Sequence, residues 1–163
     1  MMFFWAQAIG FQALWFNAIL GQNQWLLLGI ALLFCSVFFS PKRRDDLKLW
    51  PLACIGLAGD AVLTLTGIFV FEQFPLWLAT VWFGFVFTLN HSMQWLQRVK
   101  LPLQIVIGAI AGTLSYLAGA RLGAVDLPYG QWISAIVLAA YWGALLPGLL
   151  MMSRRLTTVG ATS

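Results

Sequence analysis

Long apolar stretches separate the few charged residues of this chain, and this spacing constrains the fold more than any other feature. Asp, Glu, Lys and Arg make up 9% of the 163 residues, against roughly 25% in soluble domains. Only Asp60 stands near the middle of an apolar stretch, and the other charged residues lie at the ends. Because a charge in the hydrocarbon core costs roughly 2.5–3.5 kcal/mol, this arrangement predicts a polytopic membrane protein.

A transmembrane helix needs about 20 predominantly apolar residues, and six stretches of the sequence can provide them. They cover residues 3–20, 25–40, 49–71, 76–97, 102–120 and 132–152. Pro41 ends the second stretch and Pro75 suits the start of the fourth. We therefore expect an all-α fold, with a six-helix transmembrane bundle over residues 1–156 and a short polar cytoplasmic tail over residues 157–163.

The basic residues predict the orientation of this bundle. With six spans, eight Lys and Arg residues fall on one side of the membrane, and only Arg121 falls on the other. The eight are Lys42, Arg43, Arg44, Lys48, Arg98, Lys100, Arg154 and Arg155. Because short cytoplasmic loops are rich in Lys and Arg, both termini are expected to be cytoplasmic. Bases at helix ends favour membrane lipids as partners and do not form the basic face that binds nucleic acid.

Asp60 is the main candidate for a functional residue inside the membrane. It lies about 17 Å along the third stretch, near the bilayer midplane. Gly56, Asp60, Leu63 and Gly67 share one helical face, and glycines mark a face on which another helix packs closely. Asp60 is thus expected to point into the bundle, either as a group that binds a proton or a substrate or as a tie between helices.

A second group of polar residues lies in the cytoplasmic third of the fourth stretch. Its members are Asn90, His91, Ser92 and Gln94. His91 lies on a helical stripe with Gly84 and Thr88, which predicts that it faces a closely packed helix. A water molecule or a modest helix tilt could then connect His91 with Asp60 in one interior site.

We assign these residues hypothetical roles. Asp60 and His91 are the candidate catalytic residues, and Asn90, Gln94 and Gln12 are the candidate substrate-binding residues. Gln12 lies near mid-depth in the first stretch, from which it could reach the same interior. One histidine with one aspartate is a poor metal site, so neither a metal nor a cofactor is expected.

The fifth stretch carries a ridge of small residues. They are Gly108, Gly112, Ser115, Gly119 and Gly123. Such a pattern predicts a surface for helix contact and not a ligand site. Tyr116 and Tyr141, from the fifth and sixth stretches, could add hydroxyl groups to the interior.

Several of these residues also carry a resemblance. Gly59 and Asp60, followed by Leu63, then residues 75–78 (PLWL) and 89–96 (LNHSMQWL), resemble small bacterial membrane proteins grouped as domain of unknown function 2878. The resemblance covers nearly the whole chain and implies a multi-pass protein of the bacterial inner (cytoplasmic) membrane. It implies no particular activity or catalytic residue. Such proteins are often encoded near enzymes that modify fatty acyl chains, which favours a link to lipid metabolism.

Three functions remain open from the sequence. The first is an intramembrane enzyme, or the partner of an enzyme, that acts on a lipid or fatty acyl substrate through the buried Asp and His. The second is a noncatalytic scaffold that docks membrane or soluble enzymes. The third is a small proton-coupled transporter that forms a homo-oligomer, with Asp60 as its proton site. The small polar interior favours the first, and whether the chain is an enzyme stays open.

Overall fold

The computed structural model of the chain describes residues 2–158, which form helices, turns and loops without a strand. The helices are α1 (Met2–Gly21), η1 (Gln22–Trp25), α2 (Leu26–Phe38), α3 (Arg43–Leu47), α4 (Trp50–Leu65), α5 (Leu76–Thr88), η2 (Gln94–Arg98), α6 (Leu101–Arg121) and α7 (Gly130–Thr158). The expected all-α fold is confirmed. The start of the expected tail continues α7, and residues 159–163 lie outside the described residues.

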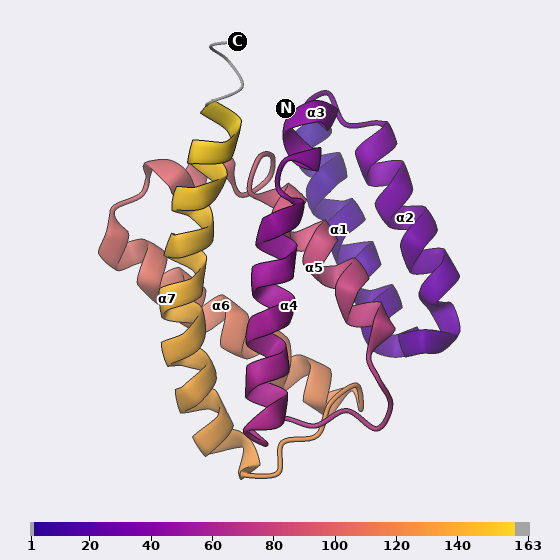
Figure 1. Ribbon diagram of the computed structural model, residues 1–163, viewed down its shortest axis with the longest axis vertical. Helices are drawn as coiled ribbons and strands as arrows, with labels where there is room; N and C mark the ends of the chain where they lie inside the picture. The colour runs from indigo at the N-terminus through magenta and orange to yellow at the C-terminus, as the bar shows by residue number, and fades with distance from the viewer. Residues whose placement is uncertain (1, 159–163) are drawn as a thin grey trace.

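Four helical runs in the described chain are long and apolar enough to cross a membrane. They are Phe4–Phe38, Arg43–Leu65, Leu101–Arg121 and Gly130–Thr157. The first run consists of α1 and α2, which fold back on each other near Gln22, where φ is 45° (Figure 1). α5 is apolar but shorter than a full span. The helices are therefore those of a membrane protein, whereas six full-length spans are not confirmed.

The third expected helix is shorter than the sequence indicated because it ends in a glycine turn. Gly67 has φ 74°, and the N–H of Ile68 donates to the carbonyl oxygen of Leu63 at 3.0 Å. This is the Schellman arrangement that closes a helix. Gly56, Asp60 and Leu63 are buried on one face of α4 as expected, whereas Gly67 lies beyond the helix.

The fourth expected helix also ends early, at Thr88. The N–H of Met93 donates to the carbonyl oxygen of Thr88 at 2.8 Å, so a turn replaces the continuing helix. Asn90 and His91 lie in this turn, where their side chains reach α3. Polar side chains with such partners override the helical pattern of the sequence. His91 therefore does not share a helical stripe with Gly84.

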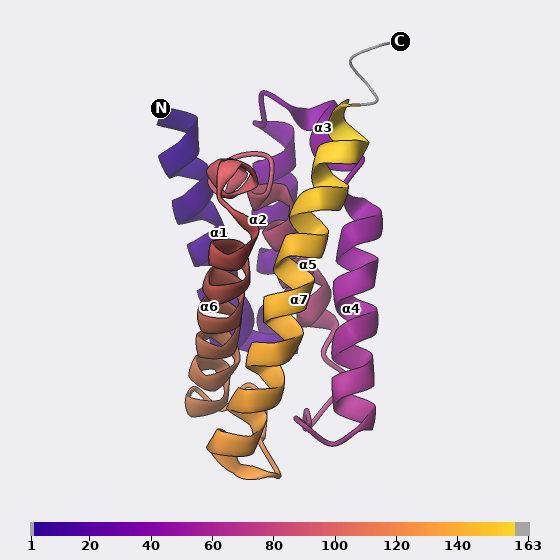
Figure 2. The ribbon, with the colours of Figure 1, turned by 90° about the vertical axis from the view of Figure 1, so that its left-hand side faces the viewer.

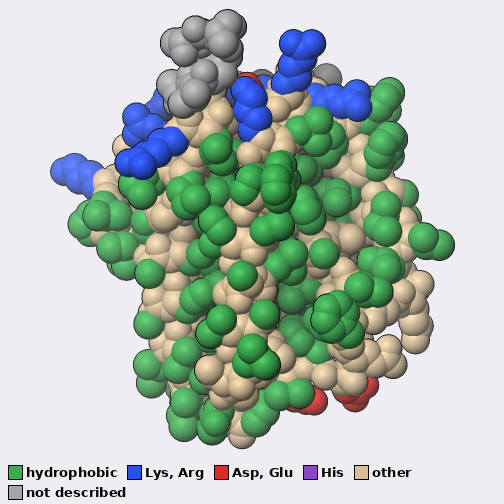
Figure 3. Space-filling view, in the orientation of Figure 1, with side chains coloured by type: hydrophobic (Ala, Val, Ile, Leu, Met, Phe, Trp, Pro, Cys, Tyr) green, Lys and Arg blue, Asp and Glu red, His purple; other side chains and the backbone are tan. Residues whose placement is uncertain are grey.

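The two ends of the bundle differ in charge. The start of α1, the whole of α3 and the end of α7 lie at one end (Figures 1 and 2). Lys and Arg side chains gather at this end on the face shown in Figure 3, and acidic side chains appear at the opposite end. There the α4–α5 loop meets the α6–α7 loop through two hydrogen bonds, of 2.8 and 2.9 Å, between the main chains of Val70 and Asp126. The bases are thus gathered as the sequence predicted.

Two tryptophans fill the interior where glycines leave room. Trp82 of α5 packs on Gly56 of α4, and Trp142 of α7 packs on Gly112 of α6. A Cβ added at either glycine would lie 2.1 Å from the indole. The two indoles stack with centroids 5.4 Å apart and an interplanar angle of 2°. The small residues on α4 and α6 are therefore helix contacts, as predicted, and they place two aromatic rings face to face.

Candidate functional site

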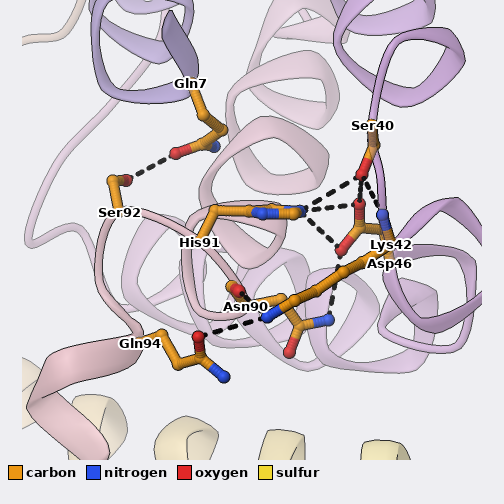
Figure 4. Close-up of polar contacts among 8 residues, drawn as sticks. All are labelled: Gln7, Ser40, Lys42, Asp46, Asn90, His91, Ser92 and Gln94. Carbon is orange, nitrogen blue, oxygen red and sulfur yellow. Dashed lines mark hydrogen bonds and ion pairs between the residues drawn. The ribbon is translucent and has the colours of Figure 1, made fainter. Parts of the chain in front are cut away.

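Buried polar side chains form a cluster at the basic end of the bundle (Figure 4). Asp46 of α3 is its centre and is 1% exposed. Its carboxylate accepts hydrogen bonds from Asn90 Nδ2 at 3.1 Å and from Ser40 Oγ. His91 Nε2 lies 2.9 Å from Asp46 Oδ2. Asp46 thus fastens α3 to the turn that follows α5.

Neighbouring side chains extend this Asp46 cluster. The Nζ of Lys42 donates to the main-chain oxygen of Asn90 at 3.1 Å and to Gln94 Oε1 at 3.2 Å. Ser92 Oγ donates to Oε1 of Gln7 in α1 (Figure 4). The Asp46 cluster therefore joins α1, the α2–α3 connection, α3, and the α5–η2 turn with the start of η2.

The chemistry available to the Asp46 cluster is proton exchange and hydrogen bonding to a polar group. Ser40 Oγ and Asp46 Oδ1 both approach His91 Nε2, at 3.3 and 3.0 Å. In a serine triad the acid and the nucleophile use opposite ring nitrogens, so this arrangement is different. Within residues 2–158, no three His, Cys, Asp or Glu side chains are grouped so that they could hold a metal ion.

Asp60 occupies a second polar site, deep in the bundle, where it is 1% exposed. Its Oδ2 accepts a hydrogen bond from Trp82 Nε1 at 2.6 Å, and its Oδ1 accepts one from Tyr116 Oη at 2.6 Å. Each carboxyl oxygen therefore has a hydrogen-bond partner, as buried polar groups require. No ion pair joins Asp60 to a Lys, Arg or His in the described part of the chain. The site connects α4, α5 and α6.

Two further aromatic groups adjoin the Asp60 site. The hydroxyl of Tyr141 lies against Gly59, where an added Cβ would be 1.9 Å from the oxygen. Tyr141 Oη and Trp142 Nε1 are buried and have no hydrogen-bond partner among the described residues. Tyr116 and Tyr141 thus bring hydroxyl groups to the interior, as the sequence indicated.

A cavity of about 450 Å³ lies between α1, α5, α6 and α7. Its walls are predominantly apolar and rich in aromatic rings. These include Trp15, Trp77, Trp82, Phe85, Tyr116 and Trp142. Gln12, Phe16 and Leu114 also line the cavity and are exposed on the outside of the chain, so they mark an opening on the side of α1 and α6.

The cavity stands next to Asp60 without reaching it. Trp82 and Tyr116 line the cavity with their rings while their polar atoms bond to the Asp60 carboxylate, which is not part of the wall. Part of the small-residue ridge of α6 also lines the cavity, including Gly112 and Ser115. The sequence predicted only helix contact for this ridge, because its pattern shows where side chains are small but not where space is left unfilled.

The two predicted catalytic residues belong to separate sites. Asp60 bonds to Trp82 and Tyr116, whereas His91 contacts Asp46 at the basic end. The reason is the early end of α5, after which the chain turns towards α3. A single interior site that contains both residues is therefore not formed.

The predicted substrate-binding residues also divide between the sites. Asn90 and Gln94 belong to the Asp46 cluster, and Gln12 lies at the opening of the cavity. Asp46 itself is not among the predicted site residues, although an acidic pair inside a basic loop is a signal that could have identified it. Nothing in the sequence distinguished Trp82 from the other tryptophans.

Comparison with known proteins identifies a family. Residues 4–148 match the family described as Protein of unknown function (DUF2878). No curated protein and no solved structure matches the chain. The matched region contains the Asp46 cluster, the Asp60 site and every residue that lines the cavity.

Proposed function

This chain belongs to the DUF2878 family, and we propose that it binds a lipid, or another molecule with a long apolar chain, in the cavity between α1, α5, α6 and α7. In this role it serves lipid metabolism, either as an intramembrane enzyme or as the membrane partner of one. The cavity is the main observation that supports this proposal. Its volume of about 450 Å³ falls within the roughly 300–1,000 Å³ of small-molecule sites, and its walls are apolar as such sites require.

The opening of the cavity supports entry from the membrane. Phe16 and Leu114 at the opening are 50% and 58% exposed, and the outer surfaces of α1 and α6 are apolar. A chain from the bilayer could pass between them without crossing water. Because lipid tails are as apolar as the cavity walls, little free energy comes from leaving the bilayer. Selectivity then depends on shape and on polar contacts such as those of Gln12.

We propose that the protein lies in the bacterial inner membrane with both termini in the cytoplasm, and the distribution of charge supports this orientation. α3, the start of α1 and the end of α7 share one end of the bundle with most of the bases (Figures 1 and 3). Glu72 and Asp126 lie in loops at the other end. The positive-inside rule then puts the basic end in the cytoplasm. In this topology α1, α2, α4, α5, α6 and α7 are the six spans, with α5 extended by its flanking loops.

The predicted site residues take separate roles in this proposal. Asp60 acts through Trp82 and Tyr116, which it holds in the cavity wall. His91, together with Asn90 and Gln94, forms the polar group of the cytoplasmic boundary, where a headgroup or a soluble enzyme can be recognised. Met93, two residues from His91, lines the cavity and so connects the two regions.

A whole-cell lipid profile by mass spectrometry tests this function. Cells that lack the protein are compared with cells that carry the wild type, Ala118→Phe or Ala140→Phe. Ala118 lines the cavity, so a phenylalanine there fills it, whereas Ala140 lies exposed on α7 away from the cavity and provides the matched control.

We expect one lipid species to be lost or to accumulate in the deletion and with Ala118→Phe, but not with Ala140→Phe at equal protein level. An identical profile in all four strains would contradict a role in lipid metabolism. It would leave a docking scaffold or a small transporter as the functions to pursue.

A further inference from the structure

Asp60 is a buried acidic group with no Lys, Arg or His partner in the described chain. Its two hydrogen bonds come from neutral donors, the indole of Trp82 and the phenol of Tyr116. Transfer of an unpaired carboxylate into an apolar interior is costly, and two neutral hydrogen bonds do not replace a counter-charge. The surroundings of Asp60 therefore favour the arrival of a positive charge close by.

The adjacent cavity offers a surface that attracts such a charge. Trp82 and Trp142 stack on each other, and Phe85 stands edge-on to both, at 5.7 and 5.5 Å between ring centroids. Aromatic faces attract cations through their negative π-clouds, and the rings of Phe85 and Tyr116 line this cavity. Trp82 and Tyr116 also donate to the carboxylate, which polarises them further. The aromatic rings and the Asp60 carboxyl group would thus attract a cation to the same part of the cavity.

We propose that the ligand of this cavity is an amphiphile with a positively charged nitrogen, a quaternary ammonium or a protonated amine. Its charged group lies against the rings of Phe85 and Tyr116, and the Asp60 carboxylate, which is hydrogen-bonded to Tyr116, lies close behind. Its apolar chain extends towards Phe16 and Leu114 at the opening. The inference rests on the proposed function, because it names the class of molecule that the same cavity takes.

Two probes that differ only in charge test the proposal. Octyltrimethylammonium carries the cation, and 2,2-dimethyldecane has the same shape with a neutral tert-butyl group in its place. Each is added to the lipid of nanodiscs that contain the full chain, and affinity is expressed as mole fraction in the bilayer. Tryptophan fluorescence reports binding, since Trp15, Trp77, Trp82 and Trp142 line the cavity. The Ala118→Phe protein supplies the signal for partition without cavity binding.

The wild type is expected to bind the cation at least about tenfold more tightly than the neutral probe, a ratio within reach of cation–π and buried-charge attraction. Asp60→Asn keeps an oxygen for Trp82 and offers an amide to Tyr116. It should reduce the ratio to near one while neutral binding persists. Phe85→Leu removes an aromatic face that does not touch Asp60. It should weaken binding of the cation more than binding of the neutral probe. This provides a second test of the cation preference if Asp60→Asn does not fold.

Each of the remaining outcomes would overturn a specific part of the proposal. Equal binding of the two probes by the wild type would overturn the cation preference and leave the proposed function standing. A preference that survives Asp60→Asn would show that Asp60 is not its source. Saturable binding of neither probe would overturn the proposed function as well.

Discussion

Trp82 Nε1 donates a 2.6 Å hydrogen bond to Asp60 Oδ2 while the ring of the same tryptophan forms part of the cavity wall. One side chain thus connects a buried carboxylate with a space that a ligand can occupy. Tyr116 repeats the connection at the other carboxylate oxygen. Substitutions at Asp60 are therefore expected to alter the cavity even though the carboxylate does not line it.

Asp60→Leu is expected to destabilise the protein more than Asp60→Asn. Leucine leaves the buried Trp82 indole and Tyr116 hydroxyl without their shared partner, at roughly 1–3 kcal/mol for each unsatisfied group. Asparagine can bond to both. Unfolding of the purified proteins in mild detergent, followed by circular dichroism, measures the difference. Equal stability of the two variants would show that these hydrogen bonds do not support the fold.

Gly56→Ala is expected to cost about 1–3 kcal/mol of unfolding free energy, because its methyl group would overlap the Trp82 ring. Gly10→Ala is the matched control. No atom lies within 4 Å of its added Cβ, so the change should stabilise α1 or leave it unaltered. The same unfolding measurement compares the two. A Gly56→Ala protein as stable as the Gly10→Ala protein would contradict the close packing of α4 on α5.

Asp46 and His91 are expected to be energetically coupled, because both are buried and each is a main partner of the other. A double-mutant cycle with Asp46→Ala and His91→Ala should give a coupling of about 0.5–3 kcal/mol. The pair Asp45 and Lys48, 2.8 Å apart on the same segment, is more exposed, with side chains 40% and 39% accessible, and should couple by no more than about 1 kcal/mol. If the buried pair couples no more than the Asp45–Lys48 pair, the Asp46 cluster does not hold α3 on the α5–η2 turn.

Labelling of single cysteines tests the proposed topology. In a background where Cys35 and Cys54 are replaced by Ala, a membrane-impermeant thiol reagent should label Glu72→Cys in intact spheroplasts. Lys100→Cys should react only after the membrane is permeabilised. Both positions are exposed, so accessibility reports the side of the membrane and not burial. The reverse pattern would invert the orientation that the basic residues predict.

The sequence predicted the helical class, the gathered bases and the inward face of Asp60, because each depends on local composition or helical period. It overestimated the lengths of α4 and α5. A pattern of apolar residues does not show that Gly67 closes one helix through its own backbone, or that Asn90 and His91 leave the other for contacts with Asp46.

The sites were harder to predict because their partners are far apart in the sequence. Asp46 and His91 lie 45 positions apart, and Asp60 and Tyr116 lie 56 apart. Such pairs are set by how helices pack and not by local spacing. The cavity is formed by four helices together, so no single segment of the sequence indicates it.

Native mass spectrometry of the protein, released from membranes without a delipidation step, tests the central claim most directly. We predict that the wild type and Ala140→Phe retain one bound amphiphile per chain, and that Ala118→Phe releases it while staying folded. Retention of the same molecule by Ala118→Phe, or its absence from the wild type, would contradict a ligand in the aromatic cavity.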